Sequence, residues 1–231
     1  MAKFVNRFVI SDTHFGHENV CTKFKNADGS PLRPFASAAE MDEAMVERWN
    51  AKVSPHDTVY HLGDVVIAKR HLETVKRLNG RKILIRGNHD IMKDRDYYDA
   101  GFEQIHGVRV FVDKFIMSHI PLHPDCVTDR FKVNLHGHLH GNEVMRRNEK
   151  VYTHIDPQTY EPSVRSRKDH NVILDESALH EPDPRYMSVC VEKTDFAPLH
   201  FDEIEARIKK RWEDTGYVGP TNAWGNGSGP G

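Results

Sequence analysis

Residues 132–142 read KVNLHGHLHGN, an apolar segment that runs into three histidines and a pair of glycines. Side chains two residues apart in an extended segment project to the same side, so His138 and His140 are expected to point the same way. Two imidazoles in this register at the end of a strand indicate a metal site. His136 is expected to pack beside that site or to orient a neighbour.

Four other apolar segments also end in polar donors. They read FVISDTH (8–14), VYHLGD (59–64), ILIRGNHD (83–90) and FIMSH (115–119). Residues just past the carboxyl ends of strands in an α/β sheet line the crevice where ligands bind, so we expect all five segments to meet in space. Together they supply seven oxygen or nitrogen donors: Asp12, His14, Asp64, Asn88, His119, His138 and His140.

This donor set contains no sulfur, which is typical of sites for divalent cations of hard or borderline character. Manganese is the expected metal, with iron, nickel or zinc as alternatives. Seven donors exceed the needs of one four-coordinate ion, whereas two divalent ions that share a carboxylate would use them. A bridging aspartate holds two ions about 3.5–4 Å apart, a separation suited to a phosphoryl group.

Short apolar runs predict strands over 4–10, 58–62, 82–86, 108–112, 114–118, 132–136 and 187–192, which alternate with helices. One helix is predicted to begin at Ser37, where Glu40 completes a capping box. Another is predicted to begin near Asp202, with Glu205 three positions later, and to finish in the basic run 209–211. Their buried faces carry Met41, Met45 and Trp49 in the first helix and Ile204, Ile208 and Trp212 in the second.

Composition narrows the class of protein. Lys and Arg number 32 against 34 Asp and Glu, and a net charge of -2 lacks the basic balance of a general nucleic-acid binder. The 3 cysteines are scattered, so neither a disulfide framework nor a thiolate zinc site is supported, and a cytoplasmic location is expected. No segment fits a signal peptide or approaches the roughly 20 apolar residues that span a bilayer, so no membrane partner is expected.

The 231 residues suffice for one domain with a substantial core. We predict this domain over 1–214, with a polar insertion around 143–185 that lacks clear periodicity. Such insertions often carry substrate-specific loops. Residues 215–231 are rich in Gly and Pro and offer little to bury, so they are predicted to form a flexible tail.

The motifs occur in a characteristic order: D-x-H at 12–14, G-D at 63–64, G-N-H-D at 87–90, a lone His119 and G-H-x-H at 137–140. This order resembles the calcineurin-like metallophosphoesterases, and in particular their small bacterial and phage phosphoesterases. The resemblance extends from about residue 4 to the strand predicted at 187–192. It implies an α/β fold, a four-layer αββα sandwich in which two mixed β-sheets lie face to face with helices outside.

The resemblance also implies roles for individual residues. One metal ion would be held by Asp12, His14, Asp64 and His140, and the other by Asp64, Asn88, His119 and His138, so Asp64 would bridge them. His89 would face the substrate as a general acid. Outside this set, His17, Asn19 and Arg86 are candidates for a phosphate contact, with ordinary structural roles as the alternative. The partner that orients His89 stays unidentified.

The implied function is hydrolysis of a small, nucleotide-like phosphate ester by a phosphodiesterase or phosphatase. A metal-bound hydroxide would attack phosphorus, and His89 would protonate the leaving oxygen. Residues 63–69 read GDVVIAK and lack the acid and the arginine that follow this motif in protein phosphatases of the superfamily. This difference argues against protein phosphatase activity.

Two other functions stay open. A metal-dependent nuclease would need a basic groove, for which the only candidates are Arg146, Arg147, Arg165, Arg167 and Lys168. Nearby acidic residues dilute these clusters, so a nucleic-acid partner is not favoured. A catalytically silent metal-binding scaffold would not need His89, and the presence of that residue argues against it.

Overall fold

The computed structural model describes residues 5–26, 28–111, 114–128, 130–147, 151–155, 162–166, 172–173 and 180–219, with side chains described outside 151–173. The chain divides into two compact units. The first unit comprises Met1–Asn142 and Pro184–Gly231, and the second comprises Glu143–Asp183. The predicted domain limits, 1–214 with an insertion around 143–185, stay a prediction. The predicted tail lies outside the described residues from 220 onward.

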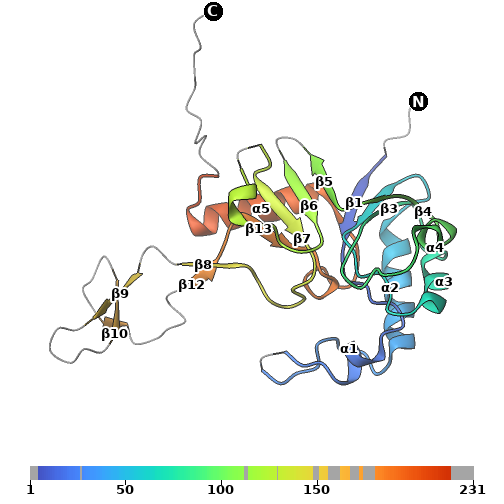
Figure 1. Ribbon diagram of the computed structural model, residues 1–231, viewed down its shortest axis with the longest axis horizontal. Helices are drawn as coiled ribbons and strands as arrows, with labels where there is room; N and C mark the ends of the chain where they lie inside the picture. Colours follow the sequence, from blue (N-terminus) through green and yellow to red (C-terminus); the bar gives the residue numbers. More distant parts are fainter. Residues whose placement is uncertain are drawn as a thin grey trace, which may run out of the picture. The chain divides into compact units, whose positions relative to one another are not determined.

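The first unit contains two mixed sheets (Figure 1). The first sheet has the order β14-β1-β2-β3-β4, in which the four consecutive strands run parallel and β14 runs antiparallel to β1. Its strands are β1 (Arg7–Ile10), β2 (Thr58–His61), β3 (Arg81–Ile85), β4 (Phe102–His106) and β14 (Leu199–His200). Parallel strands end at the same edge of a sheet, which is what brings the first three motifs together.

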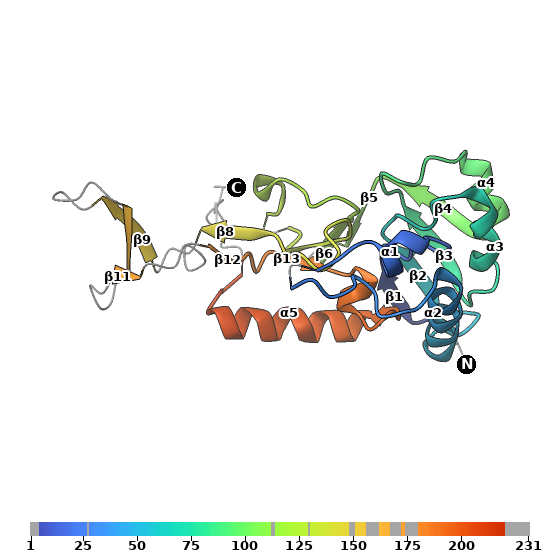
Figure 2. The same cartoon turned by 90° about the horizontal axis from the view of Figure 1, so that it is seen from below.

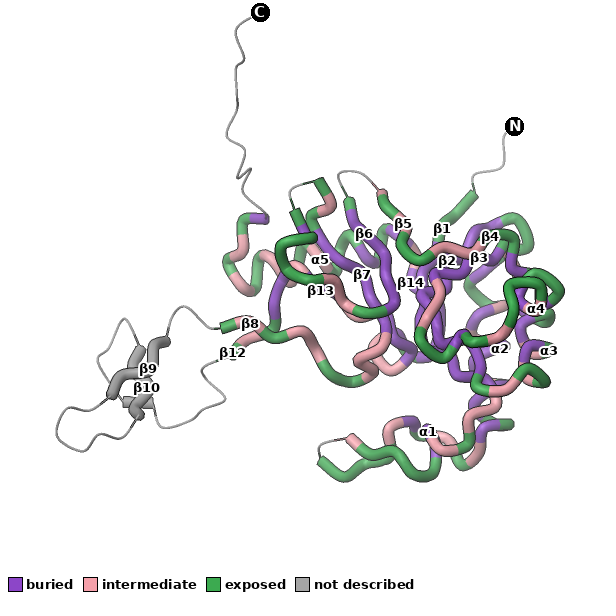
Figure 3. Tube along the Cα trace, viewed as in Figure 1, coloured by how far each residue is buried: buried purple, intermediate pink, exposed green. Residues whose placement is uncertain are grey.

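The second sheet has the order β13-β7-β6-β5. Strands β13, β7 and β6 run parallel, while β5 runs antiparallel to β6. The strands are β5 (Val108–Phe111), β6 (Phe115–Ser118), β7 (Val133–His136) and β13 (Tyr186–Ser188). Figure 3 shows β6 and β7 as buried along their length.

Alternating side chains of the first sheet enter two separate apolar cores. One core, the outer cluster, joins Phe8, Ile10, Val59 and Leu84 to the helices α2, α3 and α4. The other core, the inner cluster, joins Val9, Tyr60, Ile83 and Ile85 to Phe115, Met117, Val133 and Leu135 of the second sheet. The two sheets therefore pack face to face, because successive strand residues point to opposite faces.

The helices flank these sheets (Figure 2). They are α1 (Glu18–Thr22), α2 (Ala38–Lys52), α3 (Leu72–Val75), α4 (Asp94–Asp99) and α5 (Phe201–Thr215), with short 3-10 turns at Lys69–His71, Pro124–Cys126 and Val191–Lys193. Helix α2 buries Met41, Met45 and Trp49 in the outer cluster, and α5 buries Phe201 and Ile204 in the inner cluster. The prediction of two mixed sheets with flanking helices is confirmed.

Several predicted boundaries differ from the structure. Ser37 is the N-cap of α2 and accepts from the backbone N–H of Glu40, as predicted. Helix α5 begins at Phe201, next to the predicted start near Asp202, but its N-cap is His200, whose Nδ1 accepts from the N–H of Asp202. The helix also runs past the basic residues to Thr215, where Gly216 ends it in the left-handed conformation, with φ 67°. The strand predicted at 187–192 covers only Tyr186–Ser188, and β4 was not predicted.

The described residues of the second unit include several short strands. Strand β8 (Met145–Arg147) pairs antiparallel with β12 (His180–Pro182). A separate sheet has the order β11-β10-β9, from β9 (Val151–Ile155), β10 (Pro162–Ser166) and β11 (Val172–Ile173). Arg146 of β8 donates to Glu181 of β12, so one of the arginines considered for a basic groove is ion-paired within this unit.

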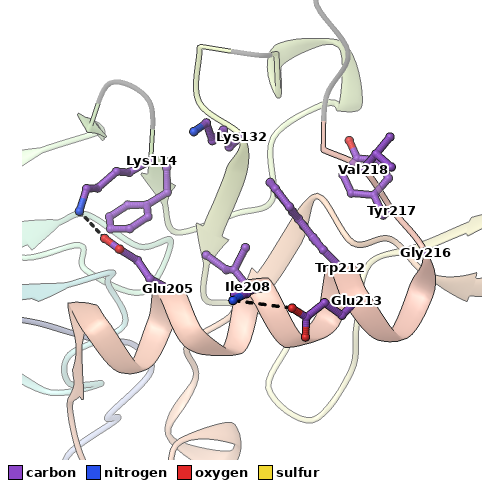
Figure 4. A pocket seen from close by; sticks show the side chains of 11 residues that line it. Lys114, Lys132, Glu205, Ile208, Trp212, Glu213, Gly216, Tyr217 and Val218 are labelled. Carbon is purple, nitrogen blue, oxygen red and sulfur yellow. Dashed lines mark hydrogen bonds and ion pairs between the residues drawn. The ribbon is translucent and has the colours of Figure 1, made fainter.

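A cavity of about 740 Å³ lies beside α5, between that helix and the starts of β6 and β7 (Figure 4). Its walls include Phe115, Ile208 and Trp212, and ion pairs of Lys114 with Glu205 and of Lys209 with Glu213 lie at its rim. None of its described lining residues is a predicted metal ligand. In the part of the chain that the structure describes, no helix has both the length and the apolar character to cross a membrane.

Asp42 of α2 is a buried carboxylate with a predictable pH response. Its Oδ1 accepts from the N–H of Gly16 at 3.0 Å, and burial raises its pKa to about 6. Asp42 therefore keeps its proton to higher pH in the folded state than in the unfolded chain, where aspartates have a pKa of about 4. As a result, the contribution of Asp42 to the free energy of unfolding falls as pH rises from about 4 to about 6. Asp42→Asn keeps an acceptor for Gly16 and removes that loss.

We compare the free energy of unfolding of Asp42→Asn with that of the original protein at each pH. The difference, variant minus original, is expected to be larger at pH 7 than at pH 4 by on the order of 1–3 kcal/mol. Urea unfolding at both values measures this difference. Asp99→Asn is the control, because Asp99 is exposed at the end of α4. Parallel pH profiles for Asp42→Asn and the original protein would contradict the assignment.

Candidate metal centre

Every predicted ligand lies just beyond a strand of the first unit. Those that follow strands of the first sheet are Asp12, His14, Asp64 and Asn88, and those that follow strands of the second sheet are His119, His138 and His140. The ligand-bearing ends of five strands therefore meet, although the residues span most of the first 140 positions.

Six of these side chains form two groups, in each of which one ligand atom per residue lies within 4.8 Å of the others. The groups are Asp12 with His14 and His140, and Asp64 with His119 and His138. Asn88 adjoins the second group, since its Oδ1 lies 2.9 Å from His119 Nε2. The grouping parallels the two ligand sets that the resemblance implies, and their role as ligands stays a prediction.

Asp64 lies between the two groups. Its Oδ2 is 3.6 Å from His14 Nε2 and 3.5 Å from His119 Nε2, so one carboxylate oxygen faces a histidine of each group. Its other oxygen, Oδ1, accepts from the backbone N–H of His89 at 2.9 Å. This hydrogen bond fixes the carboxylate and leaves Oδ2 directed at both groups, which is the geometry a bridging ligand needs.

Two observations fit the presence of cations. Asp12 Oδ1 is buried without a hydrogen-bond partner among the described residues, although it lies 3.8 Å from His14 Nε2. His119 Nδ1 lies 2.7 Å from the carbonyl oxygen of Leu62, to which it can only donate. In the neutral ring, Nε2 then directs a lone pair toward Asn88 Oδ1, so two acceptors converge. Converging, unpaired acceptors are what a cation satisfies.

Electrostatics favour the ionised form of Asp64 and the neutral form of His14. Burial of Asp64 opposes ionisation, but a protonated His119 and the N–H of His89 outweigh it and lower the pKa of the carboxyl to about 2. Burial also opposes protonation of His119, but its hydrogen bond to Asp64 and the charge of Asp12 raise its pKa, so a bound metal ion would replace that proton. Burial lowers the pKa of His14 well below its usual range, and Arg33 contributes in the same direction. Asp64 is therefore ionised and His14 neutral near pH 7, the forms that bind metal.

The backbone at the centre is unusual. Five of the seven predicted ligands have positive φ: Asp12 (58°), His14 (47°), Asp64 (57°), His138 (69°) and His140 (50°). The expectation that His138 and His140 share one side of an extended segment is therefore wrong, since both lie in a turn after β7 and belong to different groups. Such conformations cost about 1–3 kcal/mol each and cluster at functional sites.

The motif glycines allow backbone segments to approach the ligands. A Cβ on Gly63 would lie 2.4 Å from the backbone nitrogen of Gly87, and one on Gly87 would lie 2.2 Å from Asp64 Oδ1. A Cβ on Gly137 would lie 2.3 Å from Asp12 Oδ2. Contacts this short are impossible without movement, so the three glycines are required by packing against the two aspartates and against one another.

We expect Gly87→Ala to lower both metal content and the free energy of unfolding, the latter by about 1–3 kcal/mol, because the added methyl group displaces Asp64. Metal analysis of the purified protein and urea unfolding measure the two effects. Gly107→Ala is the matched control, since a Cβ at Gly107 would meet no atom within 4 Å. Full metal content in Gly87→Ala would show that Asp64 can shift without cost.

The sequence profile of the calcineurin-like phosphoesterase superfamily domain matches residues 6–177. The chain belongs to the calcineurin-like phosphoesterase superfamily. The matched region contains all seven predicted ligands and His89. Superfamily members act on phosphate esters, and the two Asp/His groups of this domain could bind divalent metal.

Two relatives of this phosphoesterase domain match it over most of their own length. An uncharacterized protein of Methanocaldococcus jannaschii is 28% identical over 212 residues, which cover 88% of this chain and 91% of that protein. A solved structure of a protein of unknown function from Aquifex aeolicus has a TM-score of 0.53 and 22% identity, and the match covers 88% of this chain and 100% of that one. A nuclease of Pseudomonas putida gives a TM-score of 0.38 and 21% identity over 58% of this chain and 61% of its own. The Aquifex structure shares the fold of this chain.

Two residues of the phosphoesterase domain were missed by sequence reasoning. Glu192 Oε1 lies 3.0 Å from His140 Nδ1 and accepts from Arg33 Nε at 2.8 Å. Arg33 is fully buried and also donates to the carbonyl oxygens of Asp12 and Thr13. A carboxylate that accepts from the second ring nitrogen holds a metal-binding histidine in orientation. No local signal marks this pair, because the two residues are 159 positions apart in the sequence.

Asp90 and Arg86 have structural contacts. Asp90 accepts from the backbone N–H groups of Asp64, Val65 and Gly87, so it fastens the G-D and G-N-H-D segments together. None of these hydrogen bonds involves the His89 ring, so they do not make Asp90 the partner that orients it. Arg86 donates to the carbonyl oxygens of Asp90 and Met92 and pairs with Asp94. Arg86 therefore has the ordinary structural role that was the alternative to a phosphate contact.

His89 has the exposure expected of a group that meets substrate. Its side chain is 53% exposed, and Nε2 lies 4.0 Å from Asp64 Oδ2. The ring is edge-on to that of His14, with centroids 5.6 Å apart. The imidazole is thus accessible to solvent and close to Asp64 and His14, while the backbone of His89 is tied to Asp64.

Proposed function

We propose that this protein is a phosphoesterase that hydrolyses a small, nucleotide-like phosphate ester with two divalent metal ions, manganese first among them. The observation that carries the proposal is the position of Asp64 Oδ2, within 3.6 Å of a histidine nitrogen of each group. Asp12, His14, Asp64 and His140 would hold one ion, and Asp64, Asn88, His119 and His138 the other. The 3 free cysteines support a cytoplasmic location.

When bound, the ions would neutralise phosphate charge and supply an activated water as nucleophile. The protein's own residues would do the rest. The hydrogen bond from His89 N–H holds Asp64 in its bridging orientation, and Glu192 holds His140. His89 Nε2, on the solvent side, would donate a proton to the leaving oxygen, which is a poor leaving group without it.

Metal content and a panel of esters test the proposal. The purified protein is analysed for bound metal, stripped with a chelator, and assayed on mono-, di- and cyclic phosphate esters before and after manganese is restored. We expect two equivalents of metal and hydrolysis that disappears with the chelator and returns with manganese. Hydrolysis by the metal-stripped protein would overturn the proposal. A metal-loaded protein that hydrolyses no ester would also overturn it and would favour a catalytically silent metal-binding scaffold.

A further inference from the structure

A second cavity, of about 570 Å³, adjoins the metal centre within the first unit. One wall is the turn that carries the predicted ligands His138 and His140 and continues to Asn142. The opposite wall is the loop between Phe24 and Leu32, of which all residues but Ala27 are described. Figure 3 shows most of this loop, which follows α1, as exposed. The cavity is therefore open to solvent at one side and bounded by candidate ligands at the other.

The loop is held in shape by its own hydrogen bonds. Leu32 N–H donates to the carbonyl oxygen of Phe24, and Asn26 N–H donates to that of Ser30, each at 2.9 Å. Asp28 accepts from both the N–H and the hydroxyl group of Ser30. A wall already ordered before binding loses little conformational entropy when a ligand enters, which favours a binding role.

Phe24 links this wall to the metal centre. Its side chain is 47% exposed, so much of the phenyl ring is accessible to a ligand. The ring packs edge-on against His17, with centroids 5.7 Å apart, and His17 in turn lies 5.5 Å from the ring of the predicted ligand His14. A group attached to a phosphate at the metal centre would therefore meet an aromatic surface next to it.

Polar groups surround the remaining cavity. Asn26 uses both hydrogens of Nδ2 on Ser30 and Pro31, so its Oδ1 is left as an acceptor. This oxygen faces the opposite wall, because a Cβ on Gly141 would lie 3.4 Å from it. Asn142 and Lys25 also line the cavity. One aromatic ring with amide groups and a cation suits a planar heteroaromatic ring with hydrogen-bonding edges, and does not suit an aliphatic chain.

We propose that this cavity, the Phe24 subsite, binds the nucleobase of a nucleotide ester whose phosphate lies at the metal centre. The inference rests on the proposed function and adds to it the place and chemistry of substrate selection. The base stacks on Phe24, and the acceptor Asn26 Oδ1 and the side chain of Asn142 read its edge.

Three diesters with one leaving group test the subsite. The 4-nitrophenyl phosphates of methanol, phenol and the thymidine 5′-hydroxyl release the same nitrophenolate, so differences in kcat/KM report on the retained group. We expect the thymidine ester to exceed the methyl ester by about 10-fold or more, since stacking of a base on an aromatic side chain contributes on that order. The phenyl ester should fall between them. A phenyl ester as good as the thymidine ester would overturn the assignment to a base.

Variants locate the effect. Phe24→Ala should lower the ratio of thymidine to methyl ester kcat/KM by about 10-fold or more, to near one, and Phe24→Tyr should restore most of it. The ratio cancels any change that affects the phosphate position itself. Tyr98→Ala is the matched control, because Tyr98 is an equally exposed aromatic residue, at 48%, on α4. An unchanged ratio in Phe24→Ala would overturn the subsite.

A binding measurement separates this inference from the proposed function. Calorimetric titration of the manganese-loaded protein with thymidine 5′-monophosphate and with inorganic phosphate requires no turnover. We expect the nucleotide to bind more tightly than phosphate, and Phe24→Ala to remove that advantage. If the protein hydrolyses no ester but binds the nucleotide more tightly than phosphate in a way that depends on Phe24, the proposed enzyme activity is rejected and the subsite is retained. Hydrolysis of all three esters at equal kcat/KM would keep the enzyme and reject the subsite.

Discussion

Asp64→Ala is expected to lose both metal ions and to reduce hydrolysis by at least about 10³-fold, because each ion contributes several kcal/mol of charge stabilisation. The reason is the position of Oδ2, which faces His14 and His119 at 3.6 and 3.5 Å. The variant also leaves the N–H of His89 without its acceptor, so the proposed general acid loses its anchor. Metal analysis and initial rates on a nitrophenyl ester measure the two losses.

Asp57→Ala is the matched control for this change. Asp57 is also buried and also accepts from backbone N–H groups, those of Asn6 and Ser54, but it precedes β2 where Asp64 follows it. We expect Asp57→Ala to be less stable yet to retain both ions. An Asp64→Ala protein with two equivalents of metal and near-normal turnover would show that the two groups do not share this residue.

His89→Asn is expected to keep both ions and to slow hydrolysis of alkyl esters by about 10²–10⁴-fold, the usual contribution of a general acid. Nitrophenolate departs as a stable anion and hardly needs a proton, so the same variant should lose much less on a nitrophenyl ester. The exposed ring of His89, whose Nε2 lies 4.0 Å from Asp64 Oδ2, motivates the prediction. Rates for a series of leaving groups, plotted against their pKa, should become steeper in the variant.

His123→Asn serves as the comparison, because His123 is an exposed histidine that caps the 3-10 turn at Pro124–Cys126. Its rates should match those of the original protein on every ester. An equal loss across good and poor leaving groups in His89→Asn, with metal content unchanged, would assign that residue to phosphate binding or to positioning of the nucleophile.

The sequence predicted the fold and the candidate site best where an apolar strand pattern is followed directly by metal-binding residue types. Apolar runs that end in Asp or His predicted both the strands and the residues that meet beyond them, because parallel strands present their carboxyl ends at one edge. Strand β4 was missed because its residues, FEQIH, are buried only at Phe102 and carry no alternating apolar pattern. The start of α5 was predicted to within one residue, but its cap was not, because His200 caps it with a ring nitrogen, which is not among the common N-caps.

Tertiary partners could not be predicted from one sequence. Arg33 and Glu192 meet across 159 positions, and Asp90 looked like a partner of its neighbour His89 but bonds to Asp64, Val65 and Gly87. The left-handed conformation of His138 and His140 could not be predicted either, because most histidines do not adopt it and the sequence does not distinguish these two. The assignment of ligands to ions stays a prediction that the metal measurements above decide.

The ligand groups draw on both sheets: Asp12 and His14 join His140, and Asp64 joins His119 and His138. Elsewhere the two sheets meet through the inner cluster, whose apolar contacts are non-directional and tolerate small sliding movements. Coordination bonds have fixed lengths and angles. Two bound ions would therefore cross-link the sheets and lock their lateral alignment, so that the position of His89 over a substrate would be set by metal occupancy as much as by folding.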